Sequence, residues 1–315
     1  MNKDIVVVAL GGNALVKRGQ KGEIEEMRVN VRQALKNIFP LVEQGKRLVI
    51  THGNGPQVGV HLLKEDAGKQ VYDTPVYPLD VLVADTQGEI GYLIESEWRN
   101  LAMERKKNIP VASLVSMVEV SEDDPAFQNP VKRVGVTYYD WEDVERFQSE
   151  KKWVFKEEIK SGEKGWRRVV PSPVPQKIVN IDAVKQLLEN DFVVIAAGGG
   201  GISVVHKNGK YRPVEAVIDK DLASSVLAED IQASSFIILT DVPNVYIHYG
   251  TPQQQALYEV SVKELDKWIA QKAFGEGNML PKVLAAKKFT EQSGQPSIIT
   301  DFQGLKNGKG TVILP

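Results

Sequence analysis

Short apolar runs alternate with stretches of helical periodicity along most of the chain. The run Ile5–Leu10 (IVVVAL) is continuous and β-branched, which is typical of a strand buried on both faces. Apolar residues then recur at helical spacing as far as Gly45, and Pro40 is predicted to kink or break that helix. A second strand follows at 47–51. Buried strands that alternate with helices indicate a parallel sheet covered on both faces.

The same alternation continues to the end of the chain. We expect further helices at 79–105, 181–188, 222–227, 262–274 and 282–291. We expect further strands at 111–118, 192–197, 235–240, 296–300 and 311–314. The pattern predicts an α/β fold with a mostly parallel central sheet.

The alternation of apolar strands and amphipathic helices is interrupted between about residues 121 and 175. This segment holds five prolines, and aromatic and charged residues alternate at 153–159 and 166–170. The turn between these two stretches, SGEKG, predicts a β-hairpin. We interpret the segment as an insertion that projects from the sheet, with an irregular surface excursion as the equally open alternative.

The amino-acid composition excludes several classes of catalytic and binding site. The 315 residues include 39 Lys+Arg and 41 Asp+Glu, for a net charge of −2, and no cysteine. Thiol nucleophiles, thiolate metal sites and disulfides are therefore excluded, and the four histidines form no close ligand pair. The charge balance argues against nucleic acid or an anionic membrane as partner. No apolar run is long enough for a membrane helix and no signal-peptide layout is seen, so we expect a cytoplasmic protein.

Three predicted strands each deliver the chain into a glycine-rich loop. The loops are Gly11-Gly12-Asn13-Ala14, His52-Gly53-Asn54-Gly55-Pro56-Gln57 and Gly198-Gly199-Gly200-Gly201. In a parallel sheet such loops gather beyond the carboxyl ends of the strands, where ligands bind. Glycine allows the backbone to approach a ligand, and a following helix N-terminus favours an anion. The three loops together predict a site for phosphate or another anion.

Lysines and aspartates near these loops supply charge. Asp219, Lys220 and Asp221 lie where a helix is predicted to begin, Lys132 lies in the insertion, and Lys282 follows a glycine-containing loop. Lysines directed at a phosphate neutralise charge on a transferring phosphoryl group. Each lysine taken alone is equally well explained as a solvated surface residue. The aspartates are equally well explained as helix caps. We expect the lysines to form a positive cleft, although the P-loop, dinucleotide and protein-kinase motifs are all absent.

Long ordered motifs then identify a family. They are VVALGGNAL from Val7, RGQKG from Arg18, THGNGPQVG from Thr51, DPAFQNPVKRVG from Asp124, GWRRVVPSP from Gly165, AAGGGGI from Ala196, EAVIDKDLAS from Glu215 and TDVPNVY from Thr240. Together they resemble the carbamate kinases of the amino-acid kinase superfamily from end to end. The resemblance implies a single domain over 1–315 with an open αβα sandwich. It also implies that 121–175 is a small protruding β-rich subdomain, and that the protein is a homodimer.

The resemblance also implies a reaction and its residues. The family transfers a phosphoryl group reversibly between ATP and carbamate, so the expected ligands are ATP or ADP with Mg²⁺ and carbamate or carbamoyl phosphate. The implied catalytic residues are Lys132, Lys220, Lys282, Asp219 and Asp221. The implied substrate and phosphate site comprises Gly11, Gly12, Asn13, Gly53, Asn54, Gly55, Gly199 and Gly200. The implied nucleotide site comprises Asp241, Val242, Tyr246, Met279 and Lys282. Asp219 or Asp221 is implied to orient the lysines and to help place Mg²⁺, and the full set of metal ligands stays unknown.

One loop departs from the family pattern. The family sequence GSMGPK corresponds here to residues 277–282, with Asn278 and Leu280 at the second and fourth positions. A leucine is unfavourable where the backbone needs a positive φ, so we expect weakened phosphate binding, relieved by Leu280→Gly. Two alternatives therefore stay open beside an active carbamate kinase. One is a catalytically impaired nucleotide-binding paralogue or sensor, and the other is a different small-acid kinase of the superfamily.

Overall fold

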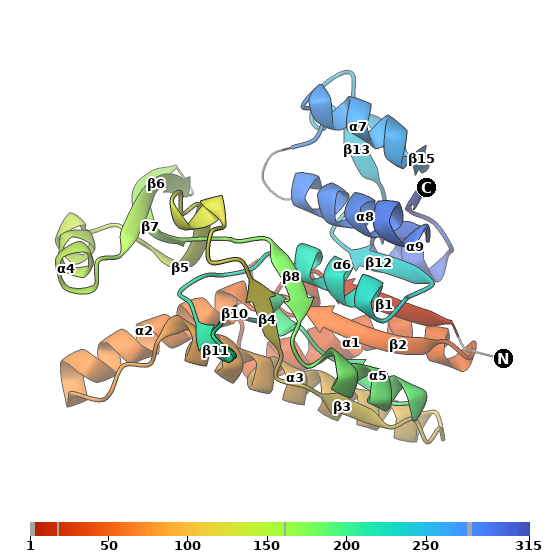
Figure 1. Ribbon diagram of the computed structural model, residues 1–315, viewed down its shortest axis with the longest axis horizontal. Helices are drawn as coiled ribbons and strands as arrows, with labels where there is room; N and C mark the ends of the chain where they lie inside the picture. The colour runs from red at the N-terminus through yellow and green to blue at the C-terminus, as the bar shows by residue number, and fades with distance from the viewer. Residues whose placement is uncertain (1–3, 18, 161, 276–278) are drawn as a thin grey trace.

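A computed structural model describes residues 4–17, 19–160, 162–275 and 279–315. Eight strands form its central sheet: β1 (Ile5–Leu10), β2 (Arg47–His52), β3 (Val111–Ser113), β9 (Val193–Ile195), β12 (Ser235–Leu239), β15 (Glu259–Ser261), β16 (Ser297–Thr300) and β17 (Thr311–Leu314). Their order is β15-β17-β16-β12-β1-β2-β9-β3, and neighbours are parallel except β16 and β17 (Figure 1). The predicted mostly parallel sheet is confirmed.

Helices cover both faces of this sheet. One face carries α1 (Ile24–Glu43), α3 (Leu79–Glu104) and the short α9 (Phe302–Lys306). The other carries α5 (Ile181–Glu189), α6 (Lys220–Asp230), α7 (Val262–Ala270) and α8 (Met279–Ser293). These layers confirm the αβα sandwich that the family resemblance implies.

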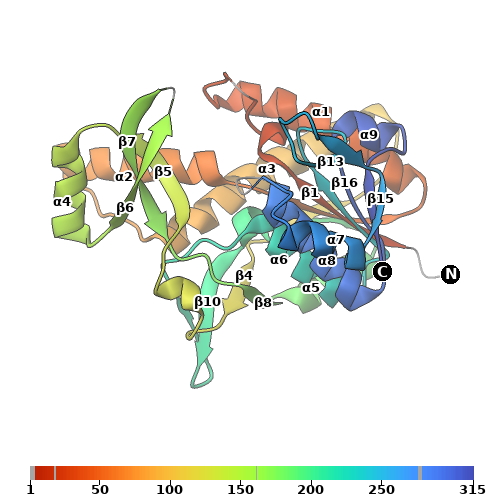
Figure 2. The same cartoon turned by 90° about the horizontal axis from the view of Figure 1, so that it is seen from above.

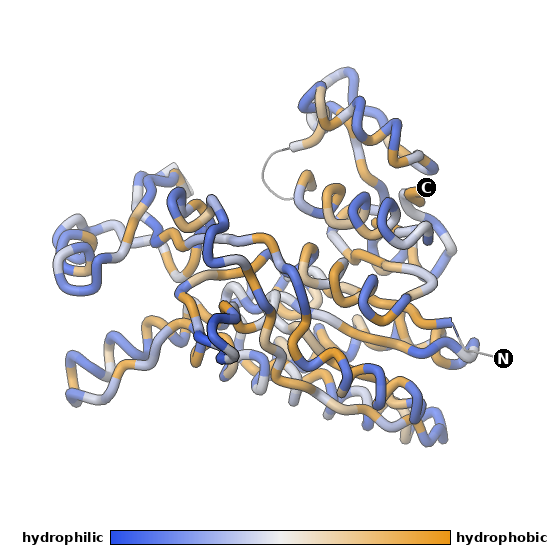
Figure 3. Tube along the Cα trace, in the orientation of Figure 1, coloured by the Kyte–Doolittle hydropathy of each residue, from blue (hydrophilic) through white to orange (hydrophobic). Residues whose placement is uncertain are grey.

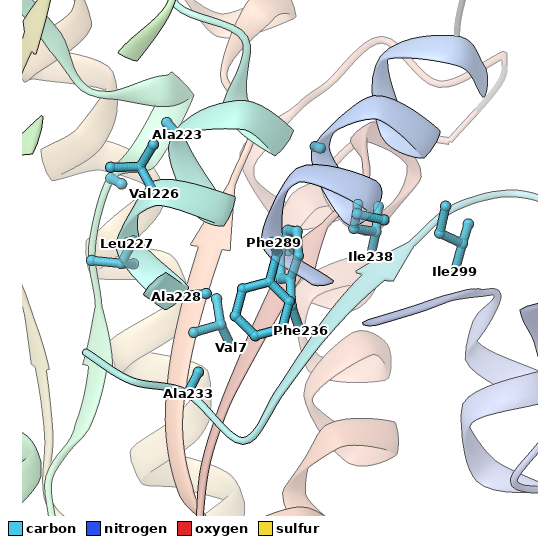
Figure 4. Packing of buried hydrophobic residues seen from close by; sticks show 14 of the residues in the cluster. Val7, Ala223, Val226, Leu227, Ala228, Ala233, Phe236, Ile238, Phe289 and Ile299 are labelled. Atoms are coloured by element: carbon cyan, nitrogen blue, oxygen red, sulfur yellow. The ribbon is translucent and has the colours of Figure 1, made fainter. Parts of the chain in front are cut away.

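Alternation of side chains along the strands divides the core in two. Val6 and Val8 of β1 pack with α1 and α3, whereas Val7 packs with α6 and α8. On that second side the rings of Phe236 and Phe289 meet edge to face at 5.6 Å (Figure 4). The strands of the sheet lie among the most hydrophobic parts of the chain (Figure 3). Burial on both faces explains why β1 reads as an unbroken apolar run.

Helices α1 and α2 differ from the sequence prediction, and α4 (Trp141–Lys151) and α9 have no counterpart in it. Helix α1 runs through Pro40 to Glu43 without a break, because Pro40 lies in the last turn and the amide of Gln44 still bonds to its carbonyl at 3.0 Å. Helix α2 (Gly55–Tyr72) has no counterpart in the prediction. Only three of its residues are buried, so the chain carries no apolar periodicity there.

The insertion contains a small unit of its own. Strands β5 (Lys132–Tyr138), β6 (Val154–Lys160) and β7 (Glu163–Val170) form an antiparallel sheet in the order β5-β7-β6, flanked by helix α4 (Trp141–Lys151). The β6–β7 pair confirms the predicted hairpin, and Ser161 of its turn lies outside the described residues. This unit, which we call the subdomain, stands apart from the central sheet (Figure 2).

A second sheet lies between the subdomain and the core. Its strands are β4 (Met117–Val120), β8 (Pro175–Ile178), β10 (Ile202–Lys207) and β11 (Lys210–Pro213), and a separate pair consists of β13 (Val245–Ile247) and β14 (Gln255–Leu257). The predicted strand at 111–118 was wrong, because the chain leaves the central sheet after β3 and enters this one at β4. At the break, the amide of Ser116 donates to Oε1 of Gln87 at 2.8 Å instead of to a strand.

The loop at 198–201 also differs from expectation. It forms a short turn, η3 (Gly198–Gly200), and continues into strand β10 rather than into a helix. The remaining short turns are η1 (Gly12–Ala14) and η2 (Pro125–Phe127). Of the helices that the structure describes, none combines the length and apolar character that a membrane crossing requires.

Candidate active site

The site lies at one edge of the central sheet, where four neighbouring parallel strands end. Strands β12, β1, β2 and β9 are adjacent, and each passes at its carboxyl end into a polar or glycine-rich loop. The loops after β1 and β12 border one cavity, and those after β2 and β9 border a second. The sheet therefore brings together the three glycine loops that the sequence singles out.

The first cavity has a volume of about 600 Å³. It is lined by Gly11, Gly12, Asn13, Thr240, Asp241, Val242, Tyr246, Tyr249, Gly275, Met279 and Lys282. All five residues expected to bind the nucleotide are among them, together with the three expected at the phosphoryl group. Sequence reasoning missed Thr240, Tyr249 and Gly275. Tyr249 follows Tyr246 by three residues, and the two rings meet edge to face at 5.8 Å, so a second aromatic beside the first was the available signal.

Gly11 shows why this cavity needs glycine. A Cβ at Gly11 would lie 2.6 Å from the carbonyl oxygen of Leu239 on the neighbouring strand β12. Any larger residue would push apart the two strands whose loops form the cavity. The glycine thus serves the close packing of β1 and β12, and Gly12 beyond it meets no atom within 4 Å of such a Cβ.

The second cavity is smaller, about 240 Å³. It is lined by Gly53, Asn54, Gly55, Val58, Lys132, Arg133, Val134, Gly199, Val217, Ile218, Asp219, Lys220, Asp221 and Lys282. The expected catalytic residues all lie here, and Lys282 borders both cavities. Sequence reasoning missed Arg133 and the apolar wall formed by valines and Ile218. An apolar wall beside a glycine loop has no pattern that separates it from ordinary core.

Asn54 and the tetraglycine loop fit against each other in this cavity. Asn54 Nδ2 donates to Thr86 Oγ1 at 2.9 Å, and Gly199 has φ +66°. A Cβ at Gly199 would lie 2.2 Å from the Asn54 amide, so only glycine leaves that amide in place. Gly200, expected at the phosphate, lines neither cavity; its φ of +90° lets it pack against the carbonyl of Ile218. Gly200 therefore supports Ile218, a residue of the cavity wall that directly precedes Asp219 and Lys220 in the chain.

A network of three lysines and two aspartates joins the cavities. Lys220 Nζ lies 2.6 Å from Asp221 Oδ1, and Lys282 Nζ lies 3.0 Å from Asp221 Oδ2. Lys132 Nζ lies 2.9 Å from Asp219 Oδ2. The other oxygen of Asp219 caps α6 by accepting from the amides of Asp221 and Leu222 at 3.0 and 3.3 Å. Capping and lysine binding thus occur in the same carboxylate.

Burial sets the electrostatics of the network. The side chain of Asp221 is 3% exposed. Burial acts to raise its pKa, but the charges of Lys220 and Lys282 outweigh burial and lower the pKa to about 2. Burial lowers the pKa of Lys220, and the nearby charge of Lys282 lowers it further, while Asp221 opposes both. Asp221 therefore holds the ammonium groups of Lys220 and Lys282 in place, and its charge opposes the lowering of the Lys220 pKa.

His52 belongs to the support of this site. Burial, followed by the charge of Lys220, lowers its pKa to about 4, so the ring is neutral near pH 7. A Cβ at Gly198 would lie 2.5 Å from the ring, which shows how closely the histidine packs under the tetraglycine loop. Its Nδ1 lies 3.0 Å from the carbonyl oxygen of Gly53. His52 fixes the relation between the loops after β2 and β9.

The departure at residues 277–282 has a different consequence from the one expected. Gly277 and Asn278 lie outside the described residues. Leu280 occupies the first turn of α8 without a positive φ, its amide bonds to the carbonyl of Gly275 at 3.3 Å, and its side chain packs on the core. The positive φ on which the expected weakening depended is absent, because Leu280 lies in a helix and a helical φ accommodates leucine.

Comparisons with known proteins agree with this geometry. A model of the amino acid kinase family matches residues 4–301. The chain therefore belongs to the amino acid kinase family, a class of phosphotransferases.

Within that family the chain groups with the carbamate kinases. It is 47% identical to the carbamate kinase of Pyrococcus furiosus over 314 residues, which cover 98% of this chain and 99% of that protein. It is 41% identical to carbamate kinase 2 of Staphylococcus aureus, with 99% of both chains covered. Its structure matches the carbamate kinase from Giardia lamblia bound to AMP-PNP with a TM-score of 0.91 at 37% identity, over 99% of this chain and 98% of that one.

Proposed function

We propose that the chain transfers a phosphoryl group reversibly between ATP and carbamate. The observation that carries this proposal is the meeting of two cavities at Lys282, with Lys220 and Asp221 beside it. The larger cavity takes the nucleotide and the smaller takes carbamate or carbamoyl phosphate. In the direction of ATP synthesis, the bond between phosphorus and the carbamate oxygen breaks while a terminal oxygen of ADP bonds to phosphorus.

Each lysine has a distinct position for this transfer. Lys220 opens helix α6 and stands in the wall of the smaller cavity, where its charge offsets charge on the transferring phosphoryl oxygens. Lys282 touches both cavities and so serves donor and acceptor, and Lys132 enters from the subdomain to hold the carbamoyl phosphate. Carbamate is already anionic, so the acceptor needs no general base. Catalysis then consists of positioning and charge stabilisation, with no covalent intermediate.

Magnesium fits this arrangement as a companion of the nucleotide. Within the described ranges no three His, Asp or Glu residues are grouped as a metal site. Asp219 and Asp221 supply carboxylate oxygens at the smaller cavity, and Mg²⁺ characteristically combines one or two carboxylates with phosphate oxygens and water. These two residues would hold the ion together with the nucleotide, and the ion would offset charge on the phosphate oxygens.

A coupled assay tests the proposal. The protein is mixed with carbamoyl phosphate and MgADP, and ATP formation is followed in the parent and in Lys220→Ala. We expect ATP formation by the parent and a loss of about 10³-fold in kcat/KM in the variant, because a preorganised charge is removed from the transition state. A parent that forms no ATP above the uncatalysed background overturns the proposal and favours the nucleotide-binding sensor. Activity with acetate or another small acid in place of carbamate favours a different small-acid kinase.

We also propose a homodimer formed through the outer surface of α1 and α3. The two helices pack side by side, with Arg28 Nη2 lying 3.4 Å from Tyr92 Oη, and they expose Ile24, Val29, Tyr92 and Met103. Exposed apolar side chains gathered on one face mark a protein interface. Light scattering after size-exclusion chromatography should give twice the mass of the chain, and Val29→Glu should give the mass of one chain. An unchanged dimer in that variant would place the interface elsewhere.

A further inference from the structure

The position of Lys132 depends on how the subdomain is attached to the core. Lys132 begins strand β5, which belongs to the subdomain sheet, yet its ammonium group lines the smaller cavity. Lys132 pairs with Val170 at the end of β7, so the placement of β7 sets the placement of Lys132. Strand β5 also packs directly on α2 through Val134 and Val58. Contacts that join β7 to the core therefore contribute to where this charge lies, beside the contacts that β5 itself makes.

Such contacts connect β7 to residues 214–219, which we call the junction segment. This segment ends at Asp219, the N-cap residue of helix α6. The amide of Val217 donates to the carbonyl of Pro171, just after β7, at 3.0 Å. Val170, Val134 and Val217 pack together and bury apolar surface between the subdomain and the core. Because the hydrophobic effect is non-directional, this packing does not fix the orientation of the subdomain. The guanidinium of Arg168 on β7 forms an ion pair with Glu215 of the junction segment.

Arg168 is an unusual residue for this place. Its side chain is 3% exposed, and its guanidinium carbon lies 3.9 Å from the centre of the Trp153 ring. Burial lowers its pKa, which reflects the cost of keeping a charge there, although Glu215 opposes the shift. An apolar residue of similar size in such a position is often neutral or stabilising. The ion pair is therefore poorly explained by the stability of the subdomain alone, and a directional role remains.

We propose that Arg168 and Glu215 are positioning residues that fix the subdomain on the junction segment, so that Lys132 enters the smaller cavity opposite Asp219. Neither residue lines either cavity, so both act through Lys132. The proposal rests on the function proposed above. It adds that this ion pair sets the position from which the subdomain supplies Lys132 for that function.

The direction in which the KM for carbamoyl phosphate changes in Glu215→Gln distinguishes a positioning role from a general effect of charge. Glu215→Gln removes a negative charge near a site for anions, so simple electrostatics lowers the KM for carbamoyl phosphate. Loss of positioning raises that KM instead, by about tenfold for a charge-assisted hydrogen bond of ordinary strength. The KM for ADP stays at the parent value, because Lys132 does not line the larger cavity.

The experiment compares four variants with the parent in the coupled assay. Glu215→Gln and Arg168→Met each raise the KM for carbamoyl phosphate, and their combination raises it no further because both remove the same contact. The matched control is Glu157→Gln, which breaks an ion pair with Lys164 inside the subdomain hairpin. Glu157 and Glu215 are 54% and 57% exposed, and of their two ion pairs only that of Glu215 joins the subdomain to the junction segment. We expect Glu157→Gln to have the parent's KM for carbamoyl phosphate and the parent's KM for ADP.

Two further measurements keep the proposal open to refutation. In a Lys132→Ala background, Glu215→Gln should leave the KM for carbamoyl phosphate where Lys132→Ala puts it; a further tenfold rise overturns the proposal. Hydrogen exchange of the peptide that contains Val217 should be about tenfold faster in Glu215→Gln than in Glu157→Gln, with or without activity. Equal exchange in the two variants, or equal rises in both KM values, overturns the positioning role. A parent that forms no ATP instead refutes the proposed function and leaves the exchange result to decide the attachment.

Discussion

Replacing Asp221 by asparagine removes the carboxylate that both Lys220 and Lys282 contact. The amide keeps the shape of the side chain but leaves two partly buried ammonium groups without their shared counter-charge. The lowered pKa of Asp221, about 2 against 3.8, corresponds to about 2 kcal/mol of net favourable interaction in the parent. Breaking a buried pair by removing one partner costs about 3 to 5 kcal/mol, so we expect unfolding free energy to fall by about 3 kcal/mol.

The pH dependence of this variant follows from the two lysines. In the parent, burial lowers the pKa of Lys220 and Asp221 opposes the shift. Without Asp221, burial and repulsion from Lys282 remain, so the pKa of Lys220 falls further. The folded variant then binds fewer protons than the unfolded chain over a wider range, and its stability recovers as pH rises. A neutral Lys220 no longer offsets phosphoryl charge, so the basic limb of the kcat/KM profile moves to lower pH.

The assay measures kcat/KM between about pH 6 and pH 10 together with denaturant unfolding at each pH. We expect kcat/KM to drop about 10² to 10³-fold near neutrality and the alkaline limb to shift downward. Asp230→Asn is the matched control, because it makes the same change on the same helix and lines neither cavity. An Asp221→Asn variant with the parent's alkaline limb and unfolding free energy would refute the idea that Asp221 opposes the lowering of the Lys220 pKa.

Two other changes test the support of the site. Leu280→Gly should cost about 1 to 2 kcal/mol of unfolding free energy and raise the KM for ADP, because it loosens the first turn of α8, where Met279 lines the larger cavity. A lower KM for ADP in the coupled assay would restore the view that leucine impairs the loop. For His52, burial lowers the folded-state pKa to about 4, below the unfolded value of 6.5, so the unfolded chain binds more protons between these values. The parent should therefore lose about 3 kcal/mol of unfolding free energy as pH falls from about 6.5 to 4, whereas His52→Gln should lose much less. Parallel urea-denaturation curves for the two proteins across that range would contradict the burial argument.

The architecture could be predicted where burial leaves a mark on the sequence. Strand β1 is buried on both faces and reads as a continuous apolar run, and Gly11 after β1 and Gly199 after β9 lie where backbone or side chains leave no room for a Cβ. Helix α2 could not be predicted, because it buries only three residues and so lacks periodicity. The split between β3 and β4 depends on Gln87, which lies far away in sequence and accepts from Ser116.

The residues of the site were easier to predict than their contacts. Lys220 and Asp221 are adjacent, and adjacent residues inside a helix do not face each other. Their contact forms because Lys220 is the first residue of α6, where the chain is only beginning to coil. Lys282 reaches the same carboxylate from α8, and Arg168 reaches Glu215 from the subdomain. Such contacts are set by tertiary packing and leave no signal in local sequence.

The expected positive cleft takes a more specific form in the structure. Three lysines border the smaller cavity, but Asp219 and Asp221 contact all three, so the network carries a net charge of 3 − 2 = +1. Burial lowers the pKa of Lys220, and the charge of Asp221 opposes that shift. The aspartates thus reduce the total charge of the cavity while holding the three ammonium groups in position. Under the proposed function, attraction of the substrates would come largely from backbone amides and from the proposed Mg²⁺, and the lysines would contribute most where phosphoryl charge develops during transfer.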